Sequence, residues 1–103
     1  MKLLTKALEK ELPALYSTDG TGELEDRIAH VKYFHPFSNW TWYGVEYSPD
    51  ERLFFGLVDG SDAEWGNFSL AELESLTFAG LGVERDLHFK PTRIGDLKLV
   101  AAS

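Results

Sequence analysis

The middle of the chain holds the feature that most constrains its fold, which is a series of strand-like segments separated by short turns. Large β-branched and aromatic side chains fill residues 39–47, 53–58 and 64–68, and the intervening residues 48–51 and 59–62 are rich in Pro, Asp, Gly and Ser. Turns this short join neighbouring strands that run in opposite directions. The sequence therefore predicts an antiparallel meander, with the almost wholly apolar residues 53–58 as a central strand covered on both faces.

Two further strands are expected, and the first of them extends the meander at its start. Residues 28–37 are rich in β-branched and aromatic side chains and are ended by Pro36, and residues 87–89 precede Pro91 as a short edge strand. Strict alternation over residues 39–47 predicts the two faces of the strongest strand. One face carries Trp40, Trp42 and Glu46, and the other carries Thr41, Tyr43, Val45 and Tyr47.

A helix is expected before the strand-forming region. Thr5 can cap this helix, and Pro13 limits its far end. Its apolar stripe consists of Leu4, Ala7, Leu8, Leu12 and Leu15. A polar loop over residues 17–26, which contains two glycines and no expected helix or strand, then leads to the first strand.

The clearest boundary follows the meander, where Ser69 and Glu72 form a capping box for a second helix. Phe68 and Leu73 complete a hydrophobic staple around this cap. The core-facing residues of the helix would be Leu70, Leu73 and Leu76, and its end would fall at Gly80 or Gly82. A short last helix capped by Thr92 would bury Ile94 and Leu97.

The length and composition fit one α+β domain over residues 1–103, in which a short, aromatic-rich antiparallel sheet packs with two or three helices. Aromatic residues make up 14% of the chain, which favours a folded core, and the absence of cysteine excludes disulfides, a thiolate zinc site and a cysteine nucleophile. The first residues are too polar for a signal peptide, and no run of about 18 apolar residues occurs. We therefore expect a cytoplasmic protein.

The net charge of −7 is concentrated in the middle of the chain. Residues 46–74 contain eight acidic residues and one basic residue, Arg52, whereas the segments before and after are nearly neutral. The acidic residues are Glu46, Asp50, Glu51, Asp59, Asp62, Glu64, Glu72 and Glu74. Charge of this sign disfavours binding to nucleic acid and to anionic membranes. The acidic residues form either a solvated face that aids solubility or a surface for a basic partner protein.

No pattern of residues points to a metal ion or a cofactor, and none is expected. Asp59, Asp62 and Glu64 lie in a glycine-containing turn, but the glycine follows the first acid immediately rather than at the position that a calcium loop requires. His30 and His35 are five residues apart in a predicted strand and would point to opposite faces. The glycines match no phosphate-binding loop, there is no Gly-x-Ser-x-Gly motif, and no residue is assigned a catalytic role.

Trp40, Trp42 and Trp65 are candidates for contacts with a partner. An aromatic strand face can stack the bases of single-stranded nucleic acid, but such sites interleave Lys and Arg, and residues 39–47 contain neither. We therefore expect these aromatic side chains to pack in the core. Where they are exposed, a contact with another protein is the expected role.

Several short stretches of the chain carry a resemblance to a known family. In order they are MKLLTK at 1–6, NWTWY at 39–43, LFFGLVDG at 53–60, EWG at 64–66, FSLAELE at 68–74 and ERD at 84–86. Through them the chain resembles the family called domain of unknown function 2958 over nearly its whole length. The resemblance implies a small bacterial protein of a kind often encoded on plasmids, phages and other mobile elements. It carries over no catalytic residues, and residues 17–22 and 95–103 match none of its motifs.

Charge and resemblance together lead to a hypothesis of function. The protein would be a non-enzymatic interaction protein of a mobile genetic element that binds the basic surface of a host protein through its acidic residues. Acids on one face of a strand repeat about every 7 Å, comparable with phosphates along one DNA strand. A DNA-mimic inhibitor of a host defence (anti-restriction or anti-CRISPR) or of a DNA-processing protein would fit. The alternative is a small enzyme that acts on a nucleotide or other small molecule through Asp59, Glu64, Glu84 and Asp86 beside a Trp-lined pocket.

Overall fold

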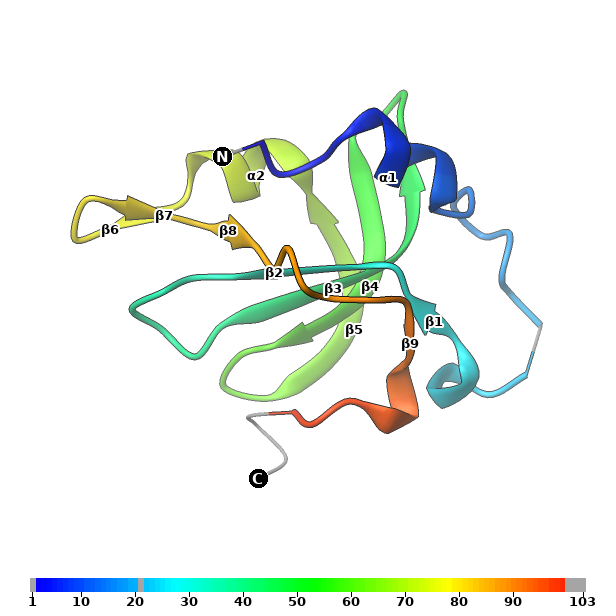
Figure 1. The fold of residues 1–103 in the computed structure, drawn as a ribbon. Coiled ribbons are helices and arrows are strands. Elements are labelled where there is room, and N and C mark those ends of the chain that lie inside the picture. The colour runs from blue at the N-terminus through cyan, green and yellow to red at the C-terminus, as the bar shows by residue number, and fades with distance from the viewer. Residues whose placement is uncertain (1, 21, 100–103) are drawn as a thin grey trace.

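A computed structural model describes residues 2–20 and 22–99, so Met1 of the first family motif, Thr21 of the polar loop and the last four residues lie outside the described part. Its centre is a five-stranded antiparallel sheet in the order β5-β4-β3-β2-β8 (Figure 1). The strands are β2 Val31–Phe34, β3 Thr41–Ser48, β4 Leu53–Asp59, β5 Ala63–Ser69 and β8 Glu84–Arg85. The predicted meander corresponds to β2 through β5, and the α+β class is confirmed.

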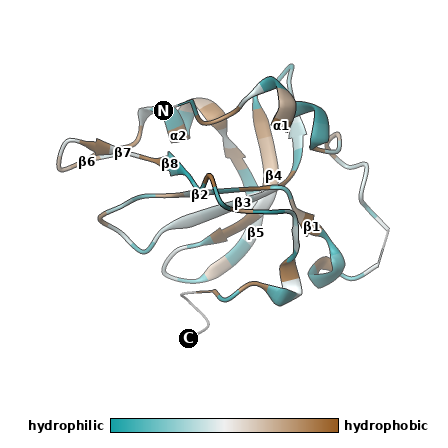
Figure 2. Cartoon of the chain, in the orientation of Figure 1, coloured by the Kyte–Doolittle hydropathy of each residue, from teal (hydrophilic) through white to brown (hydrophobic). Residues whose placement is uncertain are grey.

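Short elements surround this sheet. The α-helices are α1 Lys6–Glu11 and α2 Leu70–Ser75, and the 3-10 helices are η1 Leu24–Asp26 and η2 Ile94–Asp96. Two small antiparallel pairs complete the fold, formed by β1 Ile28–Ala29 with β9 Thr92–Arg93 and by β6 Thr77–Phe78 with β7 Leu81–Gly82. The β6–β7 hairpin extends away from the sheet as an arm, and hydrophobic residues occur along it (Figures 1 and 2).

Both α-helices pack on one face of the sheet, which we call the helix face. Its core is aromatic because the inward positions of neighbouring strands pair directly: Tyr47 lies opposite Phe54, which lies opposite Phe68. The Phe54 and Phe68 rings stack with centroids 5.1 Å apart, and Tyr33 meets Phe54 edge-on at 5.7 Å. Leu70 and Leu73 of α2 close this cluster from above.

The opposite face of the sheet has a second, smaller core. Tyr43, Val45 and Leu57 point to this side and are covered by Ala29 of β1 and Ile94 of η2. Both faces of β3 and β4 are therefore covered. This agrees with the prediction that residues 53–58 form a strand buried on both sides.

A β-bulge after Gly44 makes the predicted alternation of residues 39–47 wrong for Glu46 and Tyr47, whereas Val45 shares a face with Tyr43 as predicted. The pairing of β3 with β4 shifts there, so that Gly44 lies opposite Gly56 but Glu46 lies opposite Phe55. A bulge places two residues of one strand against one residue of its partner, so every later side chain changes face. Tyr47 consequently joins Trp42 on the helix face, and Glu46 lies on the opposite face.

Several predicted boundaries also differ. The strand expected at 28–37 is divided into β1 and β2, and the predicted edge strand at 87–89 is replaced by β8, which pairs with the free edge of β2. The second helix ends at Leu76 rather than at a glycine, because the following residues form the β6–β7 hairpin. The last helix is a 3-10 turn without a side-chain cap, and the loop at 17–26 contains η1.

Candidate functional site

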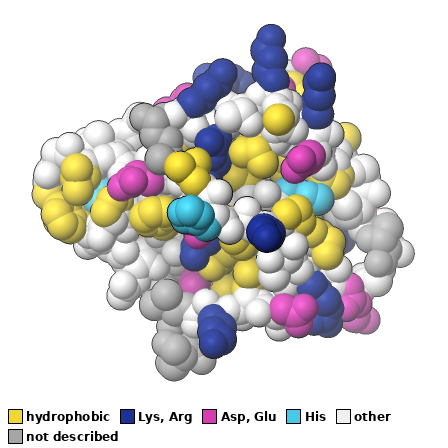
Figure 3. All heavy atoms as spheres, in the orientation of Figure 1, with side chains coloured by type: hydrophobic (Ala, Val, Ile, Leu, Met, Phe, Trp, Pro, Cys, Tyr) yellow, Lys and Arg dark blue, Asp and Glu magenta, His cyan; other side chains and the backbone are white. Residues whose placement is uncertain are grey.

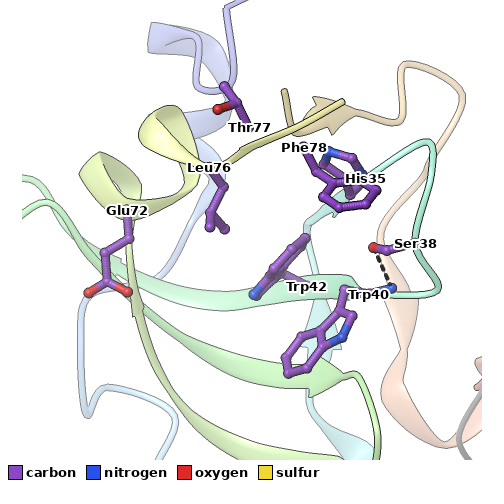
Figure 4. Close-up of a pocket in the computed structure, with 8 residues that line it drawn as sticks. All are labelled: His35, Ser38, Trp40, Trp42, Glu72, Leu76, Thr77 and Phe78. Carbon is purple, nitrogen blue, oxygen red and sulfur yellow. Dashed lines mark hydrogen bonds between the residues drawn. The ribbon is translucent and has the colours of Figure 1, made fainter. Parts of the chain in front are cut away.

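A cavity of about 470 Å³ opens beside α2, where three separate segments of the chain meet (Figure 4). The segments are the loop between β2 and β3 with the start of β3, the end of α2, and strand β6. Its lining residues are His35, Ser38, Trp40, Trp42, Glu72, Leu76, Thr77 and Phe78. We call it the aromatic cavity.

Aromatic rings from two different hairpins border the aromatic cavity. Trp42 is 8% exposed and belongs to the core of the helix face, so it forms a fixed part of the wall. Trp40 is 44% exposed, and its ring centroid lies 6.1 Å from that of Trp42 with the planes inclined by 35°. Phe78 of the β6–β7 arm is 64% exposed. Large apolar side chains are thus available to a ligand at this place.

His35 joins the two hairpins that border the cavity. Its Nδ1 accepts a hydrogen bond from the Phe37 amide at 3.2 Å, so Nε2 carries the proton and donates to the Leu81 carbonyl at 2.9 Å. The His35 ring also meets Phe78 edge-on, with centroids 6.1 Å apart. The buried imidazole therefore holds the β6–β7 arm against the β2–β3 hairpin.

The turn between β4 and β5 contacts the Trp40 ring through its backbone at Gly60. A Cβ atom at Gly60 would lie 2.7 Å from three atoms of the Trp40 ring. Only glycine leaves room for the ring at this distance, so the backbone of the turn and the indole are in direct contact. The position of Trp40 depends on this contact.

The sequence did not single out Leu76, Phe78 or His35 as parts of a site. In the structure Ala79 and Gly80 form the two-residue turn between β6 and β7, with positive φ of 55° and 80°. The sequence signal for the arm was Gly80, a favoured residue of hairpin turns. That signal was assigned to the end of a helix, which hid the exposed position of Phe78.

Two of the eight acidic residues proposed as a partner surface lie in the interior. Glu46 is 1% exposed and accepts hydrogen bonds from the amides of Tyr16 at 2.8 Å and Thr18 at 2.9 Å, and from the Thr18 hydroxyl. Asp59 is 0% exposed. Glu46 anchors the loop that follows α1, so an acidic surface would have to be formed by the other six residues.

The six exposed acidic residues are divided between two ends of the sheet. Asp50 and Glu51 lie in the β3–β4 turn, whereas Asp62 lies in the β4–β5 turn at the other end of the strands (Figure 1). Glu64 follows in β5 opposite Val58, which is itself opposite Trp42, so all three share the helix face.

The remaining two acids lie on α2. Glu72 lines the aromatic cavity, and Glu74 forms an ion pair with Arg52 at 2.8 Å. Glu64 and Glu72 are therefore the acids associated with the helix face next to Trp42.

Trp65 is separated from the other two Trp residues. It lies opposite Leu57 on the other face of the sheet, where its ring stacks on Phe55 with centroids 5.6 Å apart. The Arg27 guanidinium lies over the same Phe55 ring, 5.6 Å from its centroid. Trp65 therefore takes part in a layered contact on the opposite face rather than in the aromatic cavity.

The carboxylates of the enzyme alternative do not gather in one place. Glu84 and Asp86 line a second cavity of about 390 Å³, together with Lys32, whose Nζ lies 3.8 Å from Asp86. Asp59 and Glu64 are not among its lining residues. Figure 3 shows acidic, basic and His side chains mixed over the face seen in Figure 1, with hydrophobic side chains at the β6–β7 arm and across the middle of that face.

Tyr43 is a buried titratable group that lies near Lys32 and Asp86, two lining residues of the second cavity. Burial raises the pKa of its hydroxyl, and the nearby Asp59 and Asp86 carboxylates raise it further. The Lys32 ammonium lies over the Tyr43 ring at 5.9 Å from its centroid. Burial and the two carboxylates therefore favour the neutral phenol.

A family model described as protein of unknown function (DUF2958) matches residues 3–98. The chain belongs to this family. The match confirms the resemblance noted from the sequence, and the DUF2958 region includes every residue that lines the aromatic cavity. No curated protein and no solved structure matches the chain.

Two further findings on this DUF2958 protein concern metal ions and membranes. Over residues 2–20 and 22–99, no group of three or more His, Asp or Glu side chains is placed so that it could hold a metal ion. Within the same residues, no helix has the length and apolar character that crossing a membrane would require.

Proposed function

We propose that this protein is a non-enzymatic interaction module that binds the basic surface of a partner protein at the aromatic cavity. The observation that carries the proposal is the pair of largely exposed aromatic side chains, Trp40 and Phe78, at the border of a preformed cavity. Exposed aromatic groups beside a concave site are typical anchors of protein interfaces, where a few such residues supply most of the binding energy.

The charge around the cavity favours a basic partner. Arg52 is the one Lys or Arg between Lys32 and Arg85, and it forms an ion pair with Glu74. The lining residues of the cavity include one carboxylate, Glu72, and no Lys or Arg. A partner of positive charge is therefore attracted to this part of the molecule, and long-range attraction raises the rate of association.

A narrower form of the proposal places the protein on a mobile genetic element, as an inhibitor of a host defence or DNA-processing protein in the cytoplasm. It is supported by the net charge and by the resemblance to the family. A DNA mimic would present its acids as a continuous row. Four of the exposed acids are divided between the two ends of the sheet and the other two lie on α2, which favours a compact contact centred on one group.

The alternative of a small enzyme that acts on a nucleotide is favoured by one observation, the second cavity. There Glu84 and Asp86 lie with Lys32 and His88 at a concave surface. This function predicts turnover that is lost in Glu84→Gln. Interaction at the aromatic cavity predicts that the same substitution leaves partner binding unchanged.

Affinity capture from a bacterial host, followed by titration of the captured partner, tests the proposed function. Phe78→Ala and Leu87→Ala form a matched pair, because both side chains are 64% exposed but only Phe78 lines the aromatic cavity. We expect Phe78→Ala to weaken the complex by about 2 kcal/mol and Leu87→Ala to have little effect. Equal losses, or a loss with Leu87→Ala alone, would contradict the proposal.

A further inference from the structure

Aromatic rings and a single carboxylate make up the chemistry of the aromatic cavity. Trp40, Trp42, Phe78 and the neutral His35 ring supply π-systems, and Glu72 is the one charged group among the lining residues. The face of an aromatic ring carries partial negative charge and attracts a cation that lies within about 6 Å of the ring centroid. Trp gives the strongest attraction of this kind.

The molecule fills such positions elsewhere with its own cations, but not here. Arg27 lies over Phe55 and Lys32 lies over Tyr43, both on the opposite face of the sheet. No Lys or Arg of the described chain lines the aromatic cavity, while the Trp40 and Phe78 rings are 44% and 64% exposed. In Figure 4 Leu76 lies between Glu72 on one side and the His35 and Phe78 rings on the other.

The kind of cation is restricted by the apolar character of the wall. An unmodified ammonium group is strongly hydrated, and one carboxylate with aromatic rings replaces little of that hydration. A guanidinium or an alkylated ammonium group is weakly hydrated and keeps apolar contact with rings on several sides. A volume of about 470 Å³ leaves room for such a group together with its aliphatic stem.

We propose that the aromatic cavity binds a weakly hydrated organic cation on an aliphatic stem, held at the neighbouring Trp40 and Trp42 rings, with Glu72 as the counter-charge among the lining residues. In a partner protein this group is the side chain of arginine or of an alkylated lysine. The inference rests on the proposed function and deepens it, because it names the chemical group of the basic partner that enters the cavity.

Two small probes of the same shape test the charge requirement. Choline and 3,3-dimethyl-1-butanol differ by a quaternary nitrogen in place of a carbon atom, and each is titrated while the Trp indole N–H signals are followed by NMR. We expect choline to bind about 5-fold more tightly or better, with the largest shift at Trp40. Amides of arginine and of trimethyllysine, each compared with a neutral analogue, then distinguish the two sources of the cation.

Two variants that cause the same change in net charge test whether Glu72 is the counter-charge of the bound cation. Glu72→Gln removes the carboxylate that lines the cavity, whereas Glu51→Gln removes an exposed carboxylate of the β3–β4 turn that is not a lining residue. We expect Glu72→Gln to weaken choline binding several-fold and to leave binding of the neutral alcohol unchanged. Glu51→Gln should alter neither.

The outcomes separate this inference from the function on which it rests. Equal affinity for choline and the alcohol would overturn the cation proposal and leave an apolar docking site. The same conclusion would follow if neither probe shifted the Trp40 signal. Loss of partner binding in Phe78→Ala is measured independently, so that result alone tests the proposed function as an interaction module.

Discussion

At the scale of single residues, Gly60 is the position on which the aromatic cavity most directly depends. A Cβ atom there would lie 2.7 Å from three atoms of the Trp40 ring, so Gly60→Ala must displace the ring. Trp40 is 44% exposed and can rotate outward, so we expect little change in stability. We expect choline binding to weaken by about 5-fold or more, the amount that a cation–π contact supplies. NMR of the Trp40 indole and the choline titration measure both effects.

Gly66→Ala is the matched control for this substitution. A Cβ atom at Gly66 would meet nothing within 4 Å, and Gly66 lies in the middle of β5, the strand that follows the same turn. Because alanine loses less backbone entropy than glycine on folding, stability should stay unchanged or rise by up to about 1 kcal/mol. A shift of the Trp40 signal that is equally large in both variants would remove the role that we assign to Gly60.

The burial of the Tyr33 hydroxyl predicts how the stability of the protein changes at alkaline pH. The side chain is 0% exposed, and its hydroxyl donates to the Leu3 carbonyl at 2.7 Å. Burial raises its pKa well above the ordinary value of 10.0, against a smaller lowering by Arg85. The stabilisation is therefore complete below about pH 10 and is lost as the pH rises above it, because the unfolded chain then releases a proton that the folded chain retains.

Tyr33→Phe should change both stability and its pH dependence. At neutral pH it should cost about 1 kcal/mol through loss of the hydrogen bond, and above about pH 10 its stability should fall less steeply than that of the unmodified protein. Urea unfolding across this range measures both. Parallel curves for the two proteins would assign the alkaline loss to other groups, such as Tyr43 and Tyr47, whose pKa values burial also raises.

At the scale of elements, helix α2 depends on its cap. The Ser69 hydroxyl accepts a hydrogen bond from the Glu72 amide at 2.9 Å, as the capping box predicts, and Leu70 and Leu73 are buried behind it. Ser69→Ala should lower the free energy of unfolding by about 1 kcal/mol. Because α2 carries Glu72 and ends at Leu76, the same substitution should also weaken choline binding.

Ser75→Ala at the other end of α2 is the comparison for the cap. Its hydroxyl donates to the Glu72 carbonyl at 2.9 Å within an exposed turn, so its loss should change stability by less than about 0.5 kcal/mol. If Ser69→Ala and Ser75→Ala had the same urea midpoint, the Ser69 cap would not determine the stability of α2.

At the scale of the whole molecule, the position of the exposed acidic residues at the two ends of the sheet predicts which end of the sheet contacts the partner. Reversal of Asp62 and Glu64 to Lys changes the net charge as much as reversal of Asp50 and Glu51 to Lys. Only the first pair lies at the end of the sheet where Gly60 supports Trp40. Charge attraction is screened over about 8 Å at physiological ionic strength, so the first pair should slow association with the captured partner several-fold and the second should not.

The association rate at low and at physiological salt measures this difference. Both variants should keep the stability of the unmodified protein, because exposed charges contribute little to it. If both pairs of substitutions slowed association equally, the acidic residues would act only through the net charge of the protein. Greater slowing by Asp50 and Glu51 would place the contact at the other end of the sheet.

The sequence by itself determined the α+β class, the meander of β2 to β5 and the start of α2. Each depends on residues close together in the chain: alternating side chains within one strand, turn residues between strands, and a hydroxyl three positions from the amide that it caps. The family motifs were equally local, and the family match agrees with them. Local patterns of this kind need no knowledge of what packs against them.

Only the tertiary structure decided which side chains form the candidate site. One extra residue in the β3 bulge moved Glu46 to the other face, where amides about 30 residues earlier bury its carboxylate. The free edge of β2 selected β8 as its partner. The aromatic cavity exists because His35 hydrogen-bonds across to the Leu81 carbonyl, 46 residues later. Contacts between distant segments decide such features. A shift of one residue in the pairing of a strand reverses which side chains lie on each face, and an exposed ring forms part of a site only when segments distant in the sequence pack beside it.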